Sequence, residues 1–292
     1  MNELITAIHS LLSQAEPCQQ LSSAIAESLG HFRRIGVKGL RSSSLPAVIS
    51  WFTAQAQPAP SMVFVITGNH MRASEIVDDL EFFSPHGQRP YYWSLPEVLP
   101  YDNDDAILDD QINHLELLDI LARLKNGEKF DAPVVAVTCV EAMMWRVPSH
   151  ENTERARIVI HWGEEFVPET FAAQADKLGY QRVSTVEVRG EYAIRGGIVD
   201  IFPVTAESPI RIDLFGNEIE SMRHFDVNTQ RTNKDADELE EVQILPASER
   251  VAFGDLAEGA AHLEPLPCIP DLLPPDALVV LDSTETWMLH EE

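Results

Sequence analysis

The first half of the chain alternates between segments with a helical spacing of apolar residues and short runs that are apolar throughout. The helical spacing occurs at residues 2–13, 20–29, 71–83 and 109–127. The apolar runs lie within 61–70 and 132–148, and continuous apolar strands are typical of sheets covered on both faces. Strands that alternate with helices in this way predict a parallel α/β sheet.

The pattern changes in the second half, where hairpins replace the alternation of strands and helices. A new strand is predicted at 156–165 and a helix at 167–183. The run IRIDLFGNEIESMRHFD at 210–226 consists of two alternating segments around Gly216 and Asn217. This dipeptide favours a two-residue hairpin turn, so we expect a second, smaller α+β domain here.

An apolar run returns at 276–285, after a stretch rich in Gly, Ala, Pro and acidic residues. Because a single strand needs a sheet, we expect it to join the sheet of the first half. The smaller domain is then an insertion between two parts of a parallel α/β domain. The predicted boundaries are 1–155 plus 276–292 for the α/β domain, 156–244 for the inserted α+β domain, and 245–275 for a linker or reduced subdomain.

The net charge of the chain limits the kinds of macromolecule that it can bind. The 292 residues include 21 Lys and Arg against 47 Asp and Glu, which gives a formal net charge of −26. Such a surface repels nucleic-acid phosphates and anionic membranes, because binding to either needs clustered cations. We therefore expect a protein partner, no useful affinity for DNA and no membrane association.

Nothing in the sequence indicates a metal site, a cofactor or a catalytic group. The motifs H-E-x-x-H, C-x-x-C and G-x-S-x-G do not occur. Cys18, Cys139 and Cys268 are odd in number and far apart, which indicates a reducing compartment. No signal peptide and no apolar run of membrane-spanning length is recognisable. We expect a cytoplasmic protein without catalytic residues, metal or cofactor.

The segment GLRSSSLP, which begins at Gly39, has the register of a phosphate-binding loop, G-x-x-x-x-G-K-[ST]. Ser44 replaces the second glycine, Leu45 the lysine and Pro46 the hydroxyl residue. The first two changes remove the close backbone approach and the charge that neutralises phosphate, and proline removes a backbone donor. Asp282 follows an apolar strand but precedes serine rather than a catalytic glutamate. We therefore expect this loop to be non-functional and the chain not to hydrolyse ATP.

Three residues of the second half are candidates for binding a protein. Alternation places Arg211 and Phe215 on the strand face opposite the Ile/Ile/Leu core face, and an exposed Phe beside an Arg is typical of binding hot spots. Arg195 precedes two glycines that leave it uncovered. An open alternative is that Phe215 covers the helix at 167–178. Salt-bridge partners that would instead hold Arg195 within the fold are Asp200, Asp213 and Glu191.

Several segments carry a family resemblance: GEYAIRGGIVDIFP (190–203), PIRIDLFGNEIESMRHFDVNTQRT (209–232), LPYDND (99–104), VVAVTCVEAMMWRVP (134–148) and ILPASE (244–249). They closely resemble the N-terminal module of the bacterial transcription-repair coupling factors (Mfd) and the related domain of the excision-repair protein UvrB. UvrB has an intact phosphate loop and a DNA-clamping hairpin near 101–106, and both are missing here. Mfd is therefore the closer match, and it implies a degenerate helicase-like (RecA-type) fold for the first domain.

The resemblance implies a function. The Mfd module is not catalytic and recruits UvrA to stalled RNA polymerase, and the family's UvrA-contacting positions fall on Arg195, Arg211 and Phe215. ATP-dependent DNA translocation, and contacts with RNA polymerase and DNA, are implied only for domains missing from this chain.

Two other functions stay open. The first is a helicase-like enzyme that depends on nucleotide or DNA, which Leu45 and the net charge of −26 disfavour. The second is a purely structural or autoinhibitory domain that restrains its neighbours. Binding to UvrA separates the docking module from the structural domain.

Overall fold

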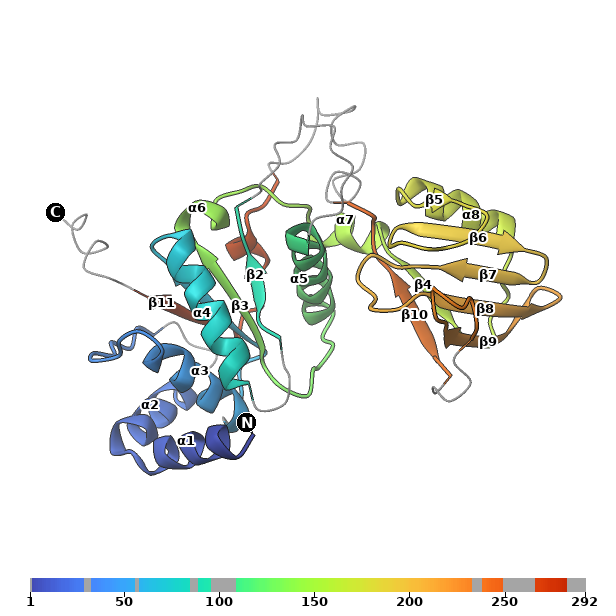
Figure 1. Cartoon of the computed structure of the whole chain (residues 1–292). Coiled ribbons are helices and arrows are strands. Elements are labelled where there is room, and N and C mark those ends of the chain that lie inside the picture. The colour runs from blue at the N-terminus through green and yellow to red at the C-terminus, as the bar shows by residue number, and fades with distance from the viewer. Residues whose placement is uncertain are drawn as a thin grey trace. The chain divides into compact units, whose positions relative to one another are not determined.

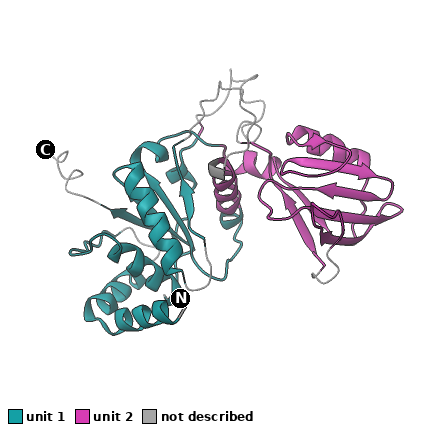
Figure 2. Cartoon of the chain, in the orientation of Figure 1, with its two compact units in different colours: residues 1–97, 123–147, 267–292 teal, residues 98–122, 148–266 magenta. Residues whose placement is uncertain are grey.

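The computed structural model divides the chain into two compact units. It describes residues 2–28, 33–55, 58–84, 89–95, 109–232, 238–248 and 266–282. Unit 1 comprises 1–97, 123–147 and 267–292, and unit 2 comprises 98–122 and 148–266 (Figure 2). Both units are therefore assembled from segments that are far apart in the sequence.

Unit 1 is built on a parallel sheet with the strand order β11-β1-β3-β2. Its strands are β1 (Met62–Thr67), β2 (Tyr91–Trp93), β3 (Val134–Cys139) and β11 (Leu278–Asp282) (Figure 1). Every residue of β1 is buried, which explains the apolar run from Met62 to Ile66. β11 pairs with β1, so the prediction that the last strand joins the first sheet is confirmed.

Helices pack against this sheet and against each other in unit 1. They are α1 (Asn2–Gln14), α2 (Glu16–Ala26), α3 (Ser44–Gln55), α4 (His70–Phe83) and α6 (Val140–Met143). Apolar residues of α3, α4 and the sheet share one core, and a second core joins α1, α2 and α3. α5 (Asp109–Lys125) contributes its first part, up to Ala122, to unit 2.

The described parts of the predicted linker or reduced subdomain, 245–275, are packed into the two units. Leu245 and Ala247 are buried in the core of unit 2. In unit 1, η3 (Ile269–Leu272) is a short 3₁₀ helix with both of its terminal side chains buried. The segment 249–265 lies outside the described residues.

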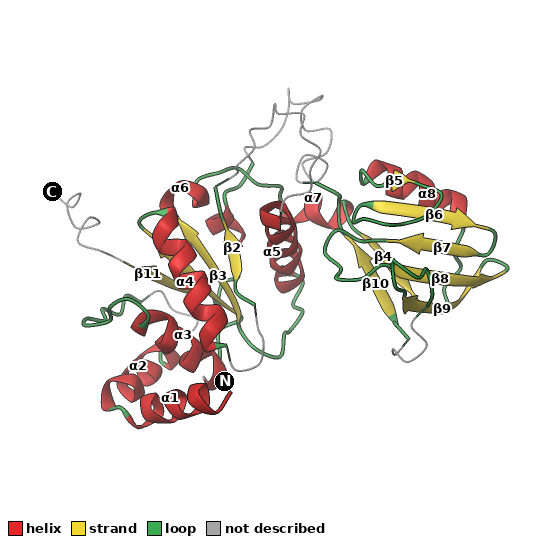
Figure 3. Cartoon of the chain, viewed as in Figure 1, coloured by secondary structure: helices red, strands yellow, loops and turns green. Residues whose placement is uncertain are grey.

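Unit 2 contains a two-stranded antiparallel sheet and a larger, mostly antiparallel sheet (Figure 3). β4 (Ile158–His161) pairs with β10 (Glu241–Ile244). The larger sheet has the order β5-β6-β7-β8-β9, and all its neighbours are antiparallel except β5 and β6. Its strands are β5 (Gln181–Arg182), β6 (Glu191–Arg195), β7 (Ile198–Ile201), β8 (Ile210–Phe215) and β9 (Glu218–His224).

The core of unit 2 lies between the larger sheet and α8 (Pro168–Lys177). Phe171 of α8 meets the ring of Tyr192 edge-on at 5.9 Å, and the inward residues of β6, β7, β8 and β9 complete the core. α7 (His150–Arg155) precedes β4. The predicted fold class, a parallel α/β domain with an inserted α+β domain, is confirmed. The opposite face of the larger sheet carries the candidate residues.

Candidate protein-binding face

Two hairpin turns lie at the same end of the five-stranded sheet, on the right in Figure 1. Gly196 and Gly197 join β6 to β7, and Gly216 begins the turn that joins β8 to β9. Gly196 and Gly216 have φ angles of 61° and 65°, in the left-handed region that favours glycine. The predicted turn at Gly216 and Asn217 is thereby confirmed.

The two hairpins are held together at this end by backbone contact. The N–H of Leu214 donates to the carbonyl of Gly197 at 2.8 Å. A Cβ at position 197 would lie 3.1 Å from the carbonyl oxygen of Leu214, closer than nearly all real side-chain contacts. The second glycine of the pair therefore permits the close approach of β8 to the first hairpin.

Arg195 and Phe215 are each the last residue of a strand before one of these turns. Their preceding neighbours, Ile194 and Leu214, pack into the core on the α8 side, so Arg195 and Phe215 lie on the other face. Phe215 is 78% exposed. The alternative that Phe215 covers the helix at 167–178 is therefore wrong.

Asp200 of β7 binds both candidate arginines. Its side chain is completely buried, on the same face as Arg195 and Arg211. Arg211 donates from Nε to Oδ1 at 2.7 Å and from its Nη2 to Oδ2 at 2.9 Å, and Arg195 donates to Oδ2. A buried carboxylate needs neutralising partners, and the two guanidinium groups supply them.

Arg211 makes several further contacts within the domain besides those to Asp200. Its Nη1 donates to the carbonyl of Gln230 at 3.1 Å and to the hydroxyl of Thr232 at 3.4 Å. Its guanidinium lies 4.6 Å from the ring centroid of Phe225, a cation–π contact. The hydrogen bonds to Asp200 raise the pKa of Arg211, so its charge is fixed at any physiological pH. Its side chain is 13% exposed.

Arg195 is both paired within the fold and partly exposed. It forms the internal salt bridge to Asp200, yet 43% of its side chain is exposed. The other two predicted partners are engaged elsewhere. Asp213 accepts a hydrogen bond from Ser221 at 3.0 Å, and Glu191 accepts from the backbone N–H groups of residues 187 and 188.

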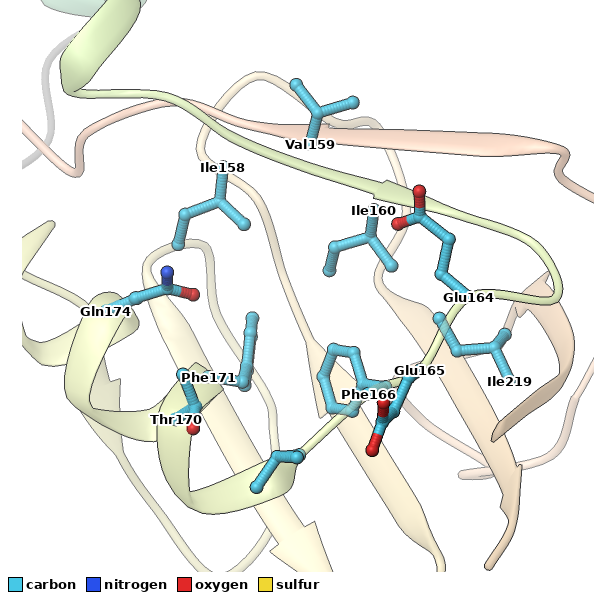
Figure 4. Close-up of a pocket in the computed structure, with 11 residues that line it drawn as sticks. Ile158, Val159, Ile160, Glu164, Glu165, Phe166, Thr170, Phe171, Gln174 and Ile219 are labelled. Atoms are coloured by element: carbon cyan, nitrogen blue, oxygen red, sulfur yellow. The ribbon is translucent and has the colours of Figure 1, made fainter. Parts of the chain in front are cut away.

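A pocket of about 210 Å³ lies on the α8 side of the unit, away from the arginines (Figure 4). Side chains of β4, α8, β9 and the loop between β4 and α8 line it, and they include two carboxylates. Its lining residues are Ile158, Val159, Ile160, Glu164, Glu165, Phe166, Val167, Thr170, Phe171, Gln174 and Ile219. None of the three candidate residues contributes to it.

The degenerate phosphate loop lies in unit 1. Gly39 has a φ of 96°, and Ser44 is the first residue of α3. Leu45, at the position of the lysine, packs against the core between α3, α4 and the sheet. Pro46 is buried in the first turn of α3, where the absent N–H is tolerated. The loop thus has an apolar side chain, packed against the core, at the position where a phosphate-binding loop has its lysine.

Asp282, at the end of β11, is bound by an arginine of α4 that the sequence did not single out. Arg72 donates from Nε to Asp282 at 2.8 Å and from Nη2 to the carbonyl of Ser42 at 3.1 Å. It also pairs with Glu75 at 3.1 Å. Arg72 therefore links the degenerate loop to the carboxyl end of the sheet. No local pattern indicates this contact, because its partners lie 30 and 210 residues away.

Among the residues that the structure describes, no group of three or more His, Cys, Asp or Glu side chains is placed to hold a metal ion. No helix in the same part of the chain is long and apolar enough to cross a membrane.

Comparison with known families matches residues 158–249 to the UvrB interaction domain, a range that contains Arg195, Arg211 and Phe215. The chain is 28% identical over 244 residues to the transcription-repair-coupling factor of Bacillus subtilis, a match that covers 84% of the chain and 19% of that protein. It is 35% identical over 153 residues to that of Escherichia coli, covering 52% of the chain and 12% of the relative. The relative from Staphylococcus haemolyticus is 30% identical over 235 residues, covering 80% and 18%.

The resemblance to an N-terminal module of the transcription-repair-coupling factors is therefore confirmed. The chain spans less than a fifth of the length of each of these three factors.

Proposed function

We propose that this chain acts in transcription-repair coupling as a non-catalytic module that docks UvrA through the exposed face of unit 2. The observation that carries the proposal is that Arg195 and Phe215 lie on the same face and at the same end of the sheet, each beside a hairpin turn. The match to the UvrB interaction domain over 158–249 supports it, and so does the name that the relatives share. Contacts with RNA polymerase and DNA are assigned to parts of the longer factors that this chain lacks.

The chemistry of the face suits a partner surface with carboxylates or carbonyls beside an apolar recess. Residues 157–243 contain 9 Lys and Arg against 17 Asp and Glu, a net charge of −8, so an exposed arginine stands out locally. Arginine favours bidentate contacts with carboxylates, and a large exposed aromatic supplies apolar area. Together they form the kind of pair that dominates binding energy at interfaces.

An enzymatic function for this chain is disfavoured by the same observations. Leu45 packs against the core of unit 1, and Arg72 already neutralises Asp282. Leu45 occupies the position of the phosphate-binding lysine, and Pro46 that of the hydroxyl residue that would hold Mg²⁺. We therefore place the ATP-driven step of the whole factors outside this chain.

The test is the affinity of UvrA for the purified chain and its Arg195→Ala and Phe215→Ala variants, measured by calorimetry. Each substitution should cost about 1–3 kcal/mol of binding free energy. The melting temperature of Arg195→Ala should fall by less than about 4 °C, because Arg211 still neutralises Asp200.

Matched controls are Arg155→Ala and Phe82→Ala. Arg155 of α7 is 78% exposed and Phe82 of α4 is 44% exposed, and both lie outside the five-stranded sheet. These controls should bind UvrA like the wild type. Unchanged affinity of folded Arg195→Ala and Phe215→Ala proteins would refute the docking function and leave the structural role as the better account.

A further inference from the structure

One stretch of unit 1 has a charge opposite to that of the rest of the chain. Residues 28–74 contain five Lys and Arg and no Asp or Glu, whereas the rest of the chain contains 16 Lys and Arg against 47 Asp and Glu, a net charge of −31. Four of the five cations fall within residues 33–41, which we call the cationic segment: Arg33, Arg34, Lys38 and Arg41. A cluster of this kind in so acidic a chain concentrates positive potential at one place on the surface.

The cationic segment is held against unit 1 by two apolar residues. It contains no helix or strand and precedes α3 (Figure 3). Ile35 and Leu40 pack against the core that α1, α2 and α3 share. The four residues between them, 36–39, are all exposed. The segment therefore has a fixed apolar base and directs its polar residues to the surface.

Three of the four cations have no partner within the described part of the chain. Arg33 pairs with Glu27 at 3.6 Å. Arg34, Lys38 and Arg41 are exposed, and their side chains make no hydrogen bond or ion pair with a described residue. Like charges that are this close in the sequence and are not neutralised within the fold attract an anionic partner.

We propose that the cationic segment binds an acidic stretch of a partner protein. Carboxylates of the partner would pair with Arg34, Lys38 and Arg41. Val37, which lies among these cations and is 49% exposed, adds an apolar contact. Because Ile35 and Leu40 already fix the segment, less conformational entropy is lost on binding than for a free loop. The proposal concerns unit 1 and does not depend on the docking of UvrA by unit 2.

Nucleic acid suits this surface less well than an acidic peptide does. Surfaces that bind single strands combine cations with aromatic side chains on which bases stack, and residues 33–41 contain no Phe, Tyr or Trp. A duplex carries one charge about every 1.7 Å along its axis, so it would extend beyond three cations and be repelled by the acidic remainder of the chain. A short acidic peptide places its carboxylates at the cationic segment alone.

Fluorescence anisotropy tests the proposal with the purified chain and a labelled peptide of Glu, Asp, Gly and Leu. Arg34→Gln/Lys38→Gln/Arg41→Gln should weaken peptide binding about tenfold, because three exposed charge pairs are lost. The matched control is Lys125→Gln/Lys129→Gln/Arg155→Gln, which removes the same charge from exposed residues outside 28–74. The control should bind within about twofold of the wild type, and added salt should weaken the wild type more than the first triple variant.

Thermal melting separates lost binding from lost fold. Both triple variants should melt within about 2 °C of the wild type, because exposed side chains contribute little to stability. If the first triple variant melts lower, Lys38→Gln alone carries the test, with an expected loss of about two- to threefold in affinity.

Four results would overturn the proposal. The first is equal weakening by the two triple variants, which would assign binding to net charge rather than to the cationic segment. The second is the absence of peptide binding by the folded wild type at low salt. The third is tighter binding of single-stranded DNA than of the peptide, lost in the first triple variant, which would assign the segment to phosphates. The fourth is self-association in sedimentation velocity that this variant abolishes, which would assign the segment to a second copy of the chain.

Discussion

Replacing Arg72 by alanine should loosen the degenerate loop of unit 1. This one side chain connects three segments: Ser42 in the loop, Glu75 on its own helix and Asp282 at the end of β11. The substitution removes all three contacts and leaves the carboxylate of Asp282 without its cation. It does not alter the packing of Leu45, so the core beneath the loop should persist.

The expected loss of stability follows from how deeply the side chains that Arg72 binds are buried. The side chains of Arg72 and Asp282 are each 20% exposed, so their 2.8 Å contact is only partly screened by solvent. Glu75 is 67% exposed and contributes little. A charge-assisted hydrogen bond in such a site contributes about 1–2 kcal/mol after desolvation, and the bond to Ser42 adds about 0.5–1 kcal/mol. We expect Arg72→Ala to lower the free energy of unfolding of unit 1 by about 2 kcal/mol.

Hydrogen exchange measured by mass spectrometry resolves this effect by segment. Peptides that cover residues 39–46 and 278–282 should exchange faster in Arg72→Ala, whereas peptides of the five-stranded sheet should not change. Asp282→Asn should give a similar result, and the double variant should add little to either. Unchanged exchange at residues 39–46, or fully additive effects of the two substitutions, would refute the role assigned to Arg72.

Three further predictions concern the whole chain. Calorimetric titration with Mg-ATP should give no binding signal, since Leu45 and Pro46 replace the residues that neutralise phosphate and hold magnesium; micromolar affinity would contradict this. Mobility-shift assays at physiological salt should show no complex with single- or double-stranded DNA, because the net charge is −26, and a clear shift at low micromolar protein would be contrary evidence. Tyr192→Phe should destabilise unit 2 by about 1 kcal/mol in urea denaturation, because the buried hydroxyl donates to Asp176 at 2.7 Å, whereas an unchanged midpoint would show that this bond contributes nothing.

The helices and strands whose apolar residues recur with a clear spacing were predictable from the sequence. Continuous apolar runs predicted strands of the parallel sheet, and the dipeptide at 216–217 predicted the hairpin and the position of its turn. The helix α2 begins at Glu16 rather than at residue 20, because a proline at position 17 fits the first turn of a helix. The helix α3 has no counterpart among the predicted helices, since serines and Pro46 at its start obscure the pattern.

For the candidate residues, the sequence predicts the strand face but not the burial of each side chain. Strand alternation assigns Arg211 and Phe215 to one face, but it does not decide how much of each side chain neighbouring segments cover. The loop that covers Arg211 folds back from residues 225–232, and its positive-φ residue, Gln230, gives no sequence signal. The pairing of Arg72 with Asp282 spans 210 residues, beyond the range of any local pattern.

The pairing of β1 with β11 has a consequence for how the chain folds during synthesis. Val63 pairs with Leu278, so the neighbour of β1 on that side emerges from the ribosome 215 residues later. At 5–20 residues per second this interval lasts roughly 10–40 s, long enough for most of the inserted unit to be complete. Until then β1, which is completely buried in the finished sheet, has an open edge on that side, and such edges promote aggregation. The sheet of unit 1 is therefore completed late, so chains that end between residues 267 and 277 should be more prone to aggregate even though every residue of unit 2 is present.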